Sequence, residues 1–590
     1  MKTIGILGWM FLAVQPAIPQ DFFSRAQKLL DVVRAEREIS PYVIAAKIRT
    51  NNDRQTALIL LDSLTRDRAI GGMFYCYSLI GAFLYTRDAL PDSLHRKVRL
   101  AFRERTMYRG DTENHWVMYY TGLYLAAQTW PGEAREMWFN GKSSEENFRE
   151  AEGWLNHWMH TTFTIGQGEF DSPTYITTFL TPMMVLHEFA ADPVMKKKAQ
   201  MMLDLLFADF AVEHLEGNYG GGHSRDYPED IINPLGAPST MWAWMYFGKP
   251  EFAQWEEARY RPRNRGGWET TFGALGSYRL PEIIRLIATD RTEAYAHTET
   301  KRVRNIIRFG AEKNPPSYKY SYVTQDYILG SLSGGILQPI QQHTWDVTFV
   351  SEKPNNSIFT LHPYYSGREL AMFFPEEIKF LADEVDRYHL VYTNPDKWNS
   401  SSPFERTFQY RNTLIVLYDI KKGEMQPHIN GFFPKTLDER WVDCSGWIIC
   451  RAGDVYVALY PLRPGAWIEE KVNWRWRSNA LKNGVIVEVG SKREDGSFAG
   501  FRKSLGKTLI DTSAFDSHVS VRFRNRHGIE MKYIFDGVRL LNGKEIQLSD
   551  YGFFDGPFIQ SETGSGRVTL RHKTRTRVLD FNKAEIIESK

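Results

Sequence analysis

The sequence predicts a helical N-terminal half followed by a β-rich C-terminal half, namely an (α/α) toroid and an antiparallel β-sandwich. Apolar residues recur at helical spacing from about Asp21 to Ile287. After about Glu293 they alternate with polar residues, as in half-buried strands. A chain of 590 residues is also too long for a single hydrophobic core. We therefore expect the toroid at 21–292 and the β-sheet domain at 293–590.

Nine helices are expected in the first half, and proline residues stand at or near several of their ends. Their ranges are 21–36, 53–64, 71–86, 91–105, 113–129, 143–161, 172–190, 194–213 and 237–247. Three of them (71–86, 113–129 and 172–190) are rich in small, aromatic and Met residues, and we expect these to form the inner ring. The charged faces of 91–105, 143–161 and 194–213 indicate an outer ring. The inner helices would then all start at one rim of the toroid.

Strands are expected throughout the second half, where Gly, Asn and Asp turns separate runs rich in β-branched and aromatic residues. The clearest runs are 320–324, 344–349, 413–418, 454–460, 485–489 and 519–523. No low-complexity linker separates the two halves, so we expect them to pack against each other.

The N-terminus has the pattern of a secretory signal peptide. Lys2 precedes the apolar run from Ile4 to Val14, and small and polar residues follow up to Gln20. The run is too short to span a bilayer, and no other stretch approaches the ~20 apolar residues that a span needs. We expect segment 1–20 to be removed and the protein to be periplasmic or secreted, without a membrane span.

Composition limits the kinds of molecule that we expect the protein to bind. A formal net charge of +2 argues against a general nucleic-acid binder. Aromatic residues make up 14% of the chain, which weakly favours a carbohydrate ligand, although we expect most of them to fill the core. Three cysteines exclude a disulfide scaffold; Cys444 and Cys450 could pair across a hairpin or remain free thiols. The oligomeric state is left open.

Three polar stretches precede inner helices or the helix at 237–247, and they are the evidence for an active site. They are 110–116 (Gly-Asp-Thr-Glu-Asn-His-Trp), 168–175 (Gly-Glu-Phe-Asp-Ser-Pro-Thr-Tyr) and 218–227, which contains Gly-Gly-Gly-His-Ser-Arg-Asp-Tyr. If the inner helices start at one rim, these stretches lie beside one another.

The first two stretches offer groups for proton transfer next to a carboxylate. Asn114 and His115 begin a helix, where backbone N–H groups and the helix dipole favour an anion. Tyr175 lies in the first turn of the next inner helix and could serve as an acid. The alternative is structural: Asn114 caps its helix, and His115 and Tyr175 are satisfied polar residues.

The third stretch adds His223, Arg225 and Tyr227, of which Arg225 suits bidentate binding of a carboxylate or sulfate. An Arg–Asp pair in a flexible turn is the structural alternative. Downstream, His343 begins a strand that could face the rim, although it could equally be a core histidine. No metal or phosphate motif is present, and the spacing of His223 and Asp226 is weak evidence for an ion, so we expect neither metal nor cofactor.

These features together resemble the heparinase II/III-like polysaccharide lyases and their alginate-lyase relatives: the signal peptide, the toroid, Asn114-His115 at a helix start, Tyr175 in the next inner helix and the following β domain. In that family an Asn and a His flank the uronate carboxylate, a Tyr protonates the leaving oxygen, and a further Tyr or His comes from the β domain. The resemblance implies that Asn114, His115, Tyr175 and His343 are catalytic.

We therefore expect a secreted lyase that cleaves a uronic-acid glycan by β-elimination, with His115 or His343 as base and Tyr175 as acid. Substrate contacts are expected from Glu113, Trp116, Asp171, His223, Arg225 and Tyr227. The acids at Asp111, Glu113, Glu169 and Asp171 are not needed by a lyase, which leaves a toroidal glycoside hydrolase open. In that alternative, two of Glu113, Glu169, Asp171 and Asp226 would face each other across the scissile bond, one as acid and one as base or nucleophile. A non-catalytic glycan-binding protein is the third alternative.

Overall fold

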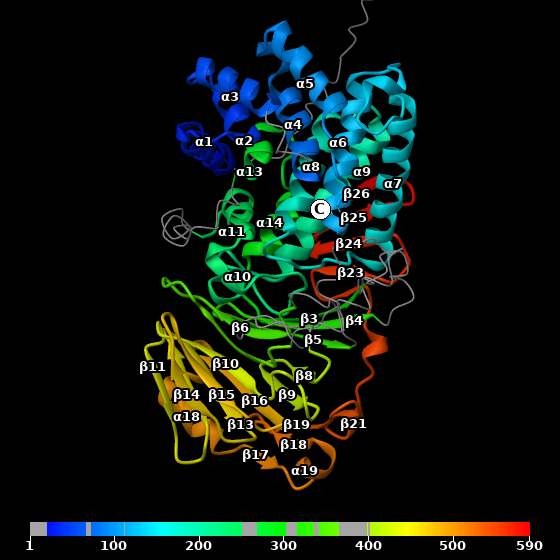
Figure 1. Cartoon of the computed structure of the whole chain (residues 1–590). Helices are drawn as coiled ribbons and strands as arrows, with labels where there is room; N and C mark the ends of the chain where they lie inside the picture. The colour runs from blue at the N-terminus through cyan, green and yellow to red at the C-terminus, as the bar shows by residue number, and fades with distance from the viewer. Residues whose placement is uncertain are drawn as a thin grey trace, which may run out of the picture.

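The structure is a computed structural model that describes residues 20–66, 72–110, 112–250, 268–302, 316–334, 342–364, 398 and 402–589. The expected signal peptide lies outside these residues, apart from its last position. Helices occupy one end of the molecule and stacked sheets the other (Figure 1). None of the described helices is both long and apolar enough to cross a membrane.

Helices dominate the chain as far as Thr289. They are α1 (Gln20–Ala35), α2 (Pro41–Arg49), α3 (Arg54–Arg66), α4 (Met73–Thr86), α5 (Asp92–Glu104), α6 (Glu113–Thr129), α7 (Ser144–Ile165), α8 (Ile176–Phe189), α9 (Pro193–Val212), α10 (Pro228–Ile232), α11 (Pro238–Trp242), α13 (Thr270–Leu275) and α14 (Glu282–Thr289). Short 3-10 turns lie at η1 (Arg87–Ala89), η2 (Arg135–Met137) and η3 (Pro234–Gly236), and a π-helical turn, η4 (Ala243–Phe247), continues α11.

Five of these helices close a ring. In order, α2 packs on α4, α4 on α6, α6 on α8, α8 on α13, and α13 again on α2. A second set lies outside the ring: α5 against α4, α7 against α6 and α9 against α8. The structure therefore confirms the toroid and the expected division into inner and outer helices. The helices α2, α10, α13 and α14 were not expected, because each is shorter than the amphipathic pattern that identified the others.

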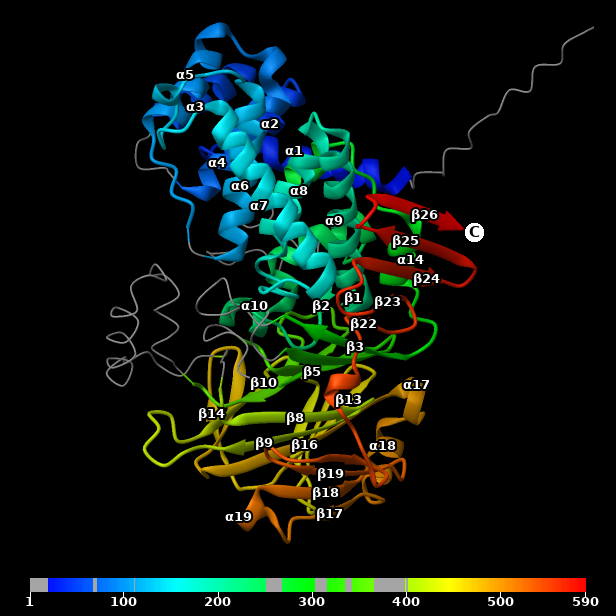
Figure 2. The ribbon, with the colours of Figure 1, turned by 90° about the vertical axis from the view of Figure 1, so that its right-hand side faces the viewer.

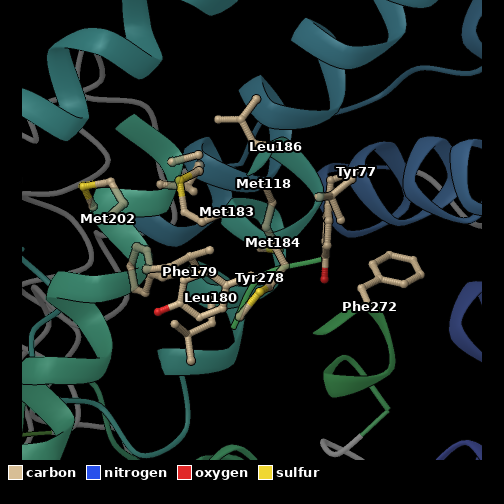
Figure 3. Close-up of a cluster of buried hydrophobic side chains, with 14 of the residues drawn as sticks. Tyr77, Met118, Phe179, Leu180, Met183, Met184, Leu186, Met202, Phe272 and Tyr278 are labelled. Carbon is tan, nitrogen blue, oxygen red and sulfur yellow. The ribbon is translucent and has the colours of Figure 1, made fainter. Parts of the chain in front are cut away.

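The interior of the ring is a core of aromatic, Met and Leu side chains. Figure 3 shows Tyr77 of α4, Met118 of α6, Phe179 and Met183 of α8 and Phe272 of α13 within one cluster of buried side chains. All five are at most 1% exposed. The composition that distinguished the inner helices thus reflects their burial on all sides.

Strands begin at Tyr295. Beyond the short pair β1 (His214–Leu215) and β2 (Asn218–Tyr219), they are β3 (Tyr295–Lys301), β4 (Ser317–Val323), β5 (Tyr327–Gly334), β6 (Trp345–Phe349), β7 (Ser357–Leu361), β8 (Glu405–Tyr410), β9 (Thr413–Asp419), β10 (Ile429–Pro434), β11 (Glu439–Val442), β12 (Ile448–Ala452), β13 (Val455–Pro461), β14 (Ala466–Glu469), β15 (Asn473–Ser478), β16 (Lys482–Ser491), β17 (Leu509–Asp511), β18 (Ser520–Arg524), β19 (Glu530–Ile534), β20 (Arg539–Leu541), β21 (Lys544–Glu545), β22 (Phe554–Asp555), β23 (Ile559–Ser561), β24 (Arg567–His572), β25 (Arg575–Asp580) and β26 (Glu585–Ser589). Among the described residues, short helices interrupt them at α17 (Lys492–Asp495), α18 (Phe498–Leu505) and α19 (Phe515–His518), with a 3-10 turn at η7 (Leu548–Asp550).

The strands form stacked antiparallel sheets, which confirms the expected β-sandwich. A 13-stranded sheet packs on a 6-stranded sheet through a core that includes Trp345, Phe359, Val416 and Val487. The other face of the 6-stranded sheet packs on the 5-stranded sheet β17–β21 and on α18. Each core is built from the side chains that point inward at every second position of the strands, as the sequence period of two predicts.

The last strands of the chain return to the helical half. β22 pairs with β3, and β23 to β26 continue the same sheet alongside α7, α9 and α14 (Figure 2). β22 lies beside β3 in the sheet although the two strands are far apart in the sequence. No local sequence pattern could therefore predict this pairing. The return thus packs part of the β half directly against α7, α9 and α14.

Candidate functional site

The rim of the toroid forms because the starts of α4, α6 and α8 lie side by side. Gly110, at φ +78°, passes so close to α4 that a Cβ there would lie 2.1 Å from Cε of Met73. Thr112 caps α6 by accepting from the backbone N–H of His115. The carboxylate of Glu113 accepts from the backbone N–H groups of Gly168 and Glu169 at 2.7 and 2.9 Å. The polar stretch before α8 is thereby fixed to the first turn of α6.

Asn114 connects the same two stretches through its side chain. Its Nδ2 donates to Oε2 of Glu169 at 2.6 Å and to Oγ1 of Thr112 at 2.8 Å, and its backbone N–H donates to the same Glu169 oxygen. Asn114 is fully buried, and its Oδ1 has no hydrogen-bond partner among the described residues. Asn114 therefore holds Glu169 and leaves one acceptor open.

Glu169 in turn forms a buried ion pair with Arg225 of the glycine-rich loop. Nε of Arg225 lies 3.0 Å from Oε1 of Glu169. Arg225 adopts a left-handed backbone conformation, with φ +55°, which is uncommon for a residue with a Cβ and is often found at functional sites. Its guanidinium lies 4.5 Å from the ring centroid of Tyr175. One arginine thus joins the loop to both ends of the stretch 168–175.

Tyr175 meets Tyr227 at the end of this chain of contacts. Their hydroxyl oxygens are 2.7 Å apart. Burial raises the pKa of Tyr175, and the charge of Arg225 opposes that rise. Tyr227 is half-buried, so this pair lies at the boundary between the interior and solvent. A phenol pair beside a guanidinium can move a proton next to a bound anion.

The β half contributes His343 to the same region. His223 and His343 exchange both backbone N–H···O bonds, and their rings stack with centroids 6.0 Å apart. Nε2 of His343 lies 3.3 Å from Oδ2 of Asp346, whose Oδ1 accepts from the backbone N–H of Gly221. Burial lowers the pKa of His223 well below its ordinary value, so that its imidazole is neutral. The His343–Asp346 pair is the arrangement of a general base with an orienting carboxylate.

Two expected site residues lie elsewhere on the rim. The ring of His115 packs edge-on against Phe74 with centroids 5.7 Å apart, facing α4. Trp116 is buried, donates from Nε1 to the carbonyl of Gly110 at 2.9 Å and is covered by Arg109. Trp116 thus joins α6 to the segment that precedes it, whereas His115 joins α6 to α4.

Glu113 and Asp171, both expected to contact substrate, are engaged within the protein. Glu113 accepts from Nε1 of Trp158 and forms an ion pair with Arg302, besides its two backbone contacts. Asp171 lies 2.9 Å from Nζ of Lys301 and 2.8 Å from Nζ of Lys319, and all three side chains are at most 2% exposed. These carboxylates connect the helical half to β3 and β4.

The surroundings of Asp171 include one group of carboxylates close enough to hold a metal ion. Within the described residues, Asp171, Asp209 and Glu299 bring ligand atoms within 4.8 Å of one another. The ammonium group of Lys301 contacts all three. A lysine therefore supplies the positive charge that an ion would otherwise provide at this position.

Several residues that complete the site were not singled out by the sequence. Glu169 was considered only as an acid of a hydrolase, and its pairing with Asn114 spans 55 residues. Lys301 and Lys319 occupy inward positions of strands β3 and β4. The alternation of His297, Glu299 and Lys301 along one strand face was the one available signal, because it places charges on the side that faces the helices.

Comparisons with known proteins give similarities of architecture at low sequence identity. No protein-family model and no curated protein matches the chain. A chondroitin AC lyase from Streptomyces coelicolor A3, solved in complex with chondroitin sulphate, superposes over 96% of this chain and 89% of its own length, with 10% identity and a TM-score of 0.41. A heparinase III structure covers 86% of this chain and 81% of its own length, with 10% identity and a TM-score of 0.38.

Proposed function

We propose that the protein is a polysaccharide lyase that cleaves a uronic-acid glycan by β-elimination. The observation that carries this proposal is the connected series Asn114, Glu169, Arg225, Tyr175 and Tyr227. It places a buried cation and two phenol hydroxyls together at the rim of a toroid. Elimination beside a carboxylate needs these two kinds of group.

Arg225 is assigned to the substrate carboxylate. The proton at C5 of a uronate is removed only when the adjacent carboxylate is neutralised, since otherwise the carbanion-like state is too high in energy. A guanidinium suits this role because it is permanently charged and binds carboxylates with two hydrogen bonds. Asn114 holds Glu169 and, through it, the orientation of Arg225.

The proton movements follow from the remaining groups. We assign His343, oriented by Asp346, as the base that takes the C5 proton. The electron pair of that bond forms the C4=C5 double bond while the bond from C4 to the glycosidic oxygen breaks. Tyr175, hydrogen-bonded to Tyr227, gives its proton to the departing oxygen. His115 remains the other candidate for the base, approaching from the α4 side of the rim.

Three of the four acids considered for the hydrolase alternative are paired with cations among the described residues. The fourth, Asp226, contacts the hydroxyl of Thr174, and Asp111 lies outside the described residues. Glu113 and Asp171 are tied to Arg302, Lys301 and Lys319, and Glu169 is paired with Arg225. A hydrolase needs one carboxyl group as acid and another as base or nucleophile across the scissile bond. We further propose that the substrate is an acidic polysaccharide met outside the cytoplasm, from the signal-peptide pattern at 1–20.

The test is a panel of uronic-acid polysaccharides incubated with the protein while ultraviolet absorbance and reducing ends are followed together. Elimination creates a double bond conjugated to the carboxylate, so we expect absorbance and reducing ends to rise in parallel. Reducing ends without absorbance would support the hydrolase, and binding with neither signal would support a glycan-binding protein. Arg225→Lys is the matched variant: it keeps the charge, loses bidentate geometry and should lower turnover.

A further inference from the structure

The hydroxyl of Thr174 lies between two buried carboxyl groups that no step above uses. Oγ1 of Thr174 is 2.9 Å from Oδ1 of Asp226 and in close contact with Oδ2 of Asp230. Asp226 and Asp230 are 1% and 5% exposed. Thr174 and Asp226 belong to two of the polar stretches at the rim, and Asp230 lies in the first turn of α10.

A single hydroxyl cannot satisfy two ionised carboxylates. Thr174 has one hydroxyl hydrogen, so it donates to one carboxylate, and the other contact is a hydrogen bond only if that carboxyl group carries a proton. The backbone N–H of Tyr227 donates to Oδ1 of Asp226, which favours the ionised form there. The proton therefore belongs on Asp230, which donates to Thr174, which donates to Asp226.

The surrounding charges agree with a retained proton. Burial raises the pKa of Asp226, and the nearby carboxylates of Asp230 and Asp346 raise it further. Burial also raises the pKa of Asp230, to about 7, with Thr174 lowering it and Glu229 raising it. The charged groups that shift these two pKa values, Asp346 and Glu229 besides the pair itself, are all acids. Ionising both Asp226 and Asp230 would therefore place repelling charges in a buried space.

This proton-sharing group is adjacent to the phenol pair on both sides. Thr174 precedes Tyr175, and Asp226 precedes Tyr227, whose hydroxyl meets that of Tyr175 at 2.7 Å. We propose that Asp230 and Thr174 are positioning residues, which hold Tyr175 against Tyr227 through one shared proton and release that alignment when the proton is lost. The inference rests on the proposed function of Tyr175 for its catalytic consequence, but not for the proton itself.

The proton is tested first, without substrate. Infrared spectra of the full-length protein and of Asp230→Asn are compared from about pH 5 to about pH 9, with Asp88→Asn as the matched change at an exposed acid. Other buried acids such as Glu213 contribute to the protonated-carboxyl band in all three proteins. We therefore expect a difference between the wild type and Asp230→Asn, namely a band component that is lost from the wild type and from Asp88→Asn as pH rises through about 7 and is missing from Asp230→Asn. Spectra in which Asp230→Asn retains that component, or the wild type never shows it, overturn the proposal.

Thermal unfolding gives a second readout. The pKa of Asp230 is raised on folding, so its contribution to stability is complete below its ordinary pKa and is lost as pH rises through about 7. The wild type should therefore lose stability relative to Asp230→Asn over that interval, because the amide donates to Thr174 without a titrating proton. Parallel curves for the two proteins would contradict the proposal. Thr174→Ser keeps the hydroxyl and should behave as the wild type, while Thr174→Val should not.

Turnover then tests the positioning role. The alkaline limb of kcat against pH should move upward by about one pH unit or more in Asp230→Asn, with KM little changed. An unchanged limb with that infrared component present would overturn the positioning role. If the protein lacks lyase activity altogether, the infrared and unfolding results still decide whether the proton is shared, so the two failures are distinguishable.

Discussion

Nε of Arg225 lies 3.0 Å from Oε1 of Glu169, and the two side chains are 3% and 0% exposed. Two hydrogen bonds from Asn114 reach the other oxygen of the same carboxylate. Glu169 is therefore the point at which the first turn of α6 and the glycine-rich loop are joined.

Replacing Glu169 tests this junction. Glu169→Gln keeps the shape but leaves the guanidinium of Arg225 buried without its counter-charge, which typically costs about 3–5 kcal/mol. We expect the free energy of unfolding to fall by that order, measured by chemical denaturation. Glu145→Gln is the control, because its pair with Arg149 is exposed on both sides and should change stability by less than about 1 kcal/mol. Equal effects of the two changes would contradict a stabilising role for Glu169.

Tyr175→Phe removes one hydroxyl from the phenol pair. If Tyr175 protonates the leaving oxygen, turnover should fall ~10²- to 10⁴-fold while the protein remains folded. The matched change is Tyr124→Phe on α6, since that buried hydroxyl has no hydrogen-bond partner among the described residues. Thermal midpoint and turnover are measured on the same samples. Near-wild-type turnover of Tyr175→Phe would remove this residue from the mechanism.

The two candidate bases can be separated by their effects on the pH profile. His343 is oriented by Asp346, whereas His115 packs on Phe74. We expect His343→Ala to lower kcat ~10²- to 10⁴-fold and Asp346→Asn to lower it less, with a shifted acidic limb. His115→Ala should then act mainly on KM. The opposite pattern would assign the base to His115.

A pH dependence of stability is expected from Glu213 at the interface of the two halves. Burial raises its pKa to about 7, although Lys319 lowers it. Because the folded pKa exceeds the ordinary value, this contribution to stability is present at low pH and lost as pH rises through about 7. Glu213→Gln should flatten the dependence of the thermal midpoint on pH, whereas Glu216→Gln, which is 44% exposed, should not. An unchanged slope in Glu213→Gln would show that another group titrates.

The sequence predicted the fold class because the evidence for it is local. Helical spacing identified α4, α6 and α8 and their inner position, and alternation identified strands such as β9 and β13. Sequence order could not predict that β22 pairs with β3, because partners in a sheet are selected by packing over long separations.

The sequence predicted which residues belong to the candidate site better than it predicted their contacts. The sequence indicated Asn114, Tyr175 and Arg225, and the structure joins them through Glu169. The burial of Lys319 could not be predicted, because a charged side chain in a strand normally faces solvent. Its burial is offset here by the carboxylates of Asp171, which precedes α8, and Glu213, which follows α9, and only the fold brings these close.

The most direct test of the proposed elimination is mass spectrometry of the products formed in water labelled with the heavy oxygen isotope. Elimination breaks the bond from C4 to the glycosidic oxygen without adding water, so the new unsaturated end should carry no heavy oxygen and the product pair should be lighter by one water than a hydrolysed pair. The wild type should give this result on a uronic-acid polysaccharide, and Tyr175→Phe should give it much more slowly. Incorporation of one heavy oxygen per cleavage would contradict the lyase and identify a hydrolase.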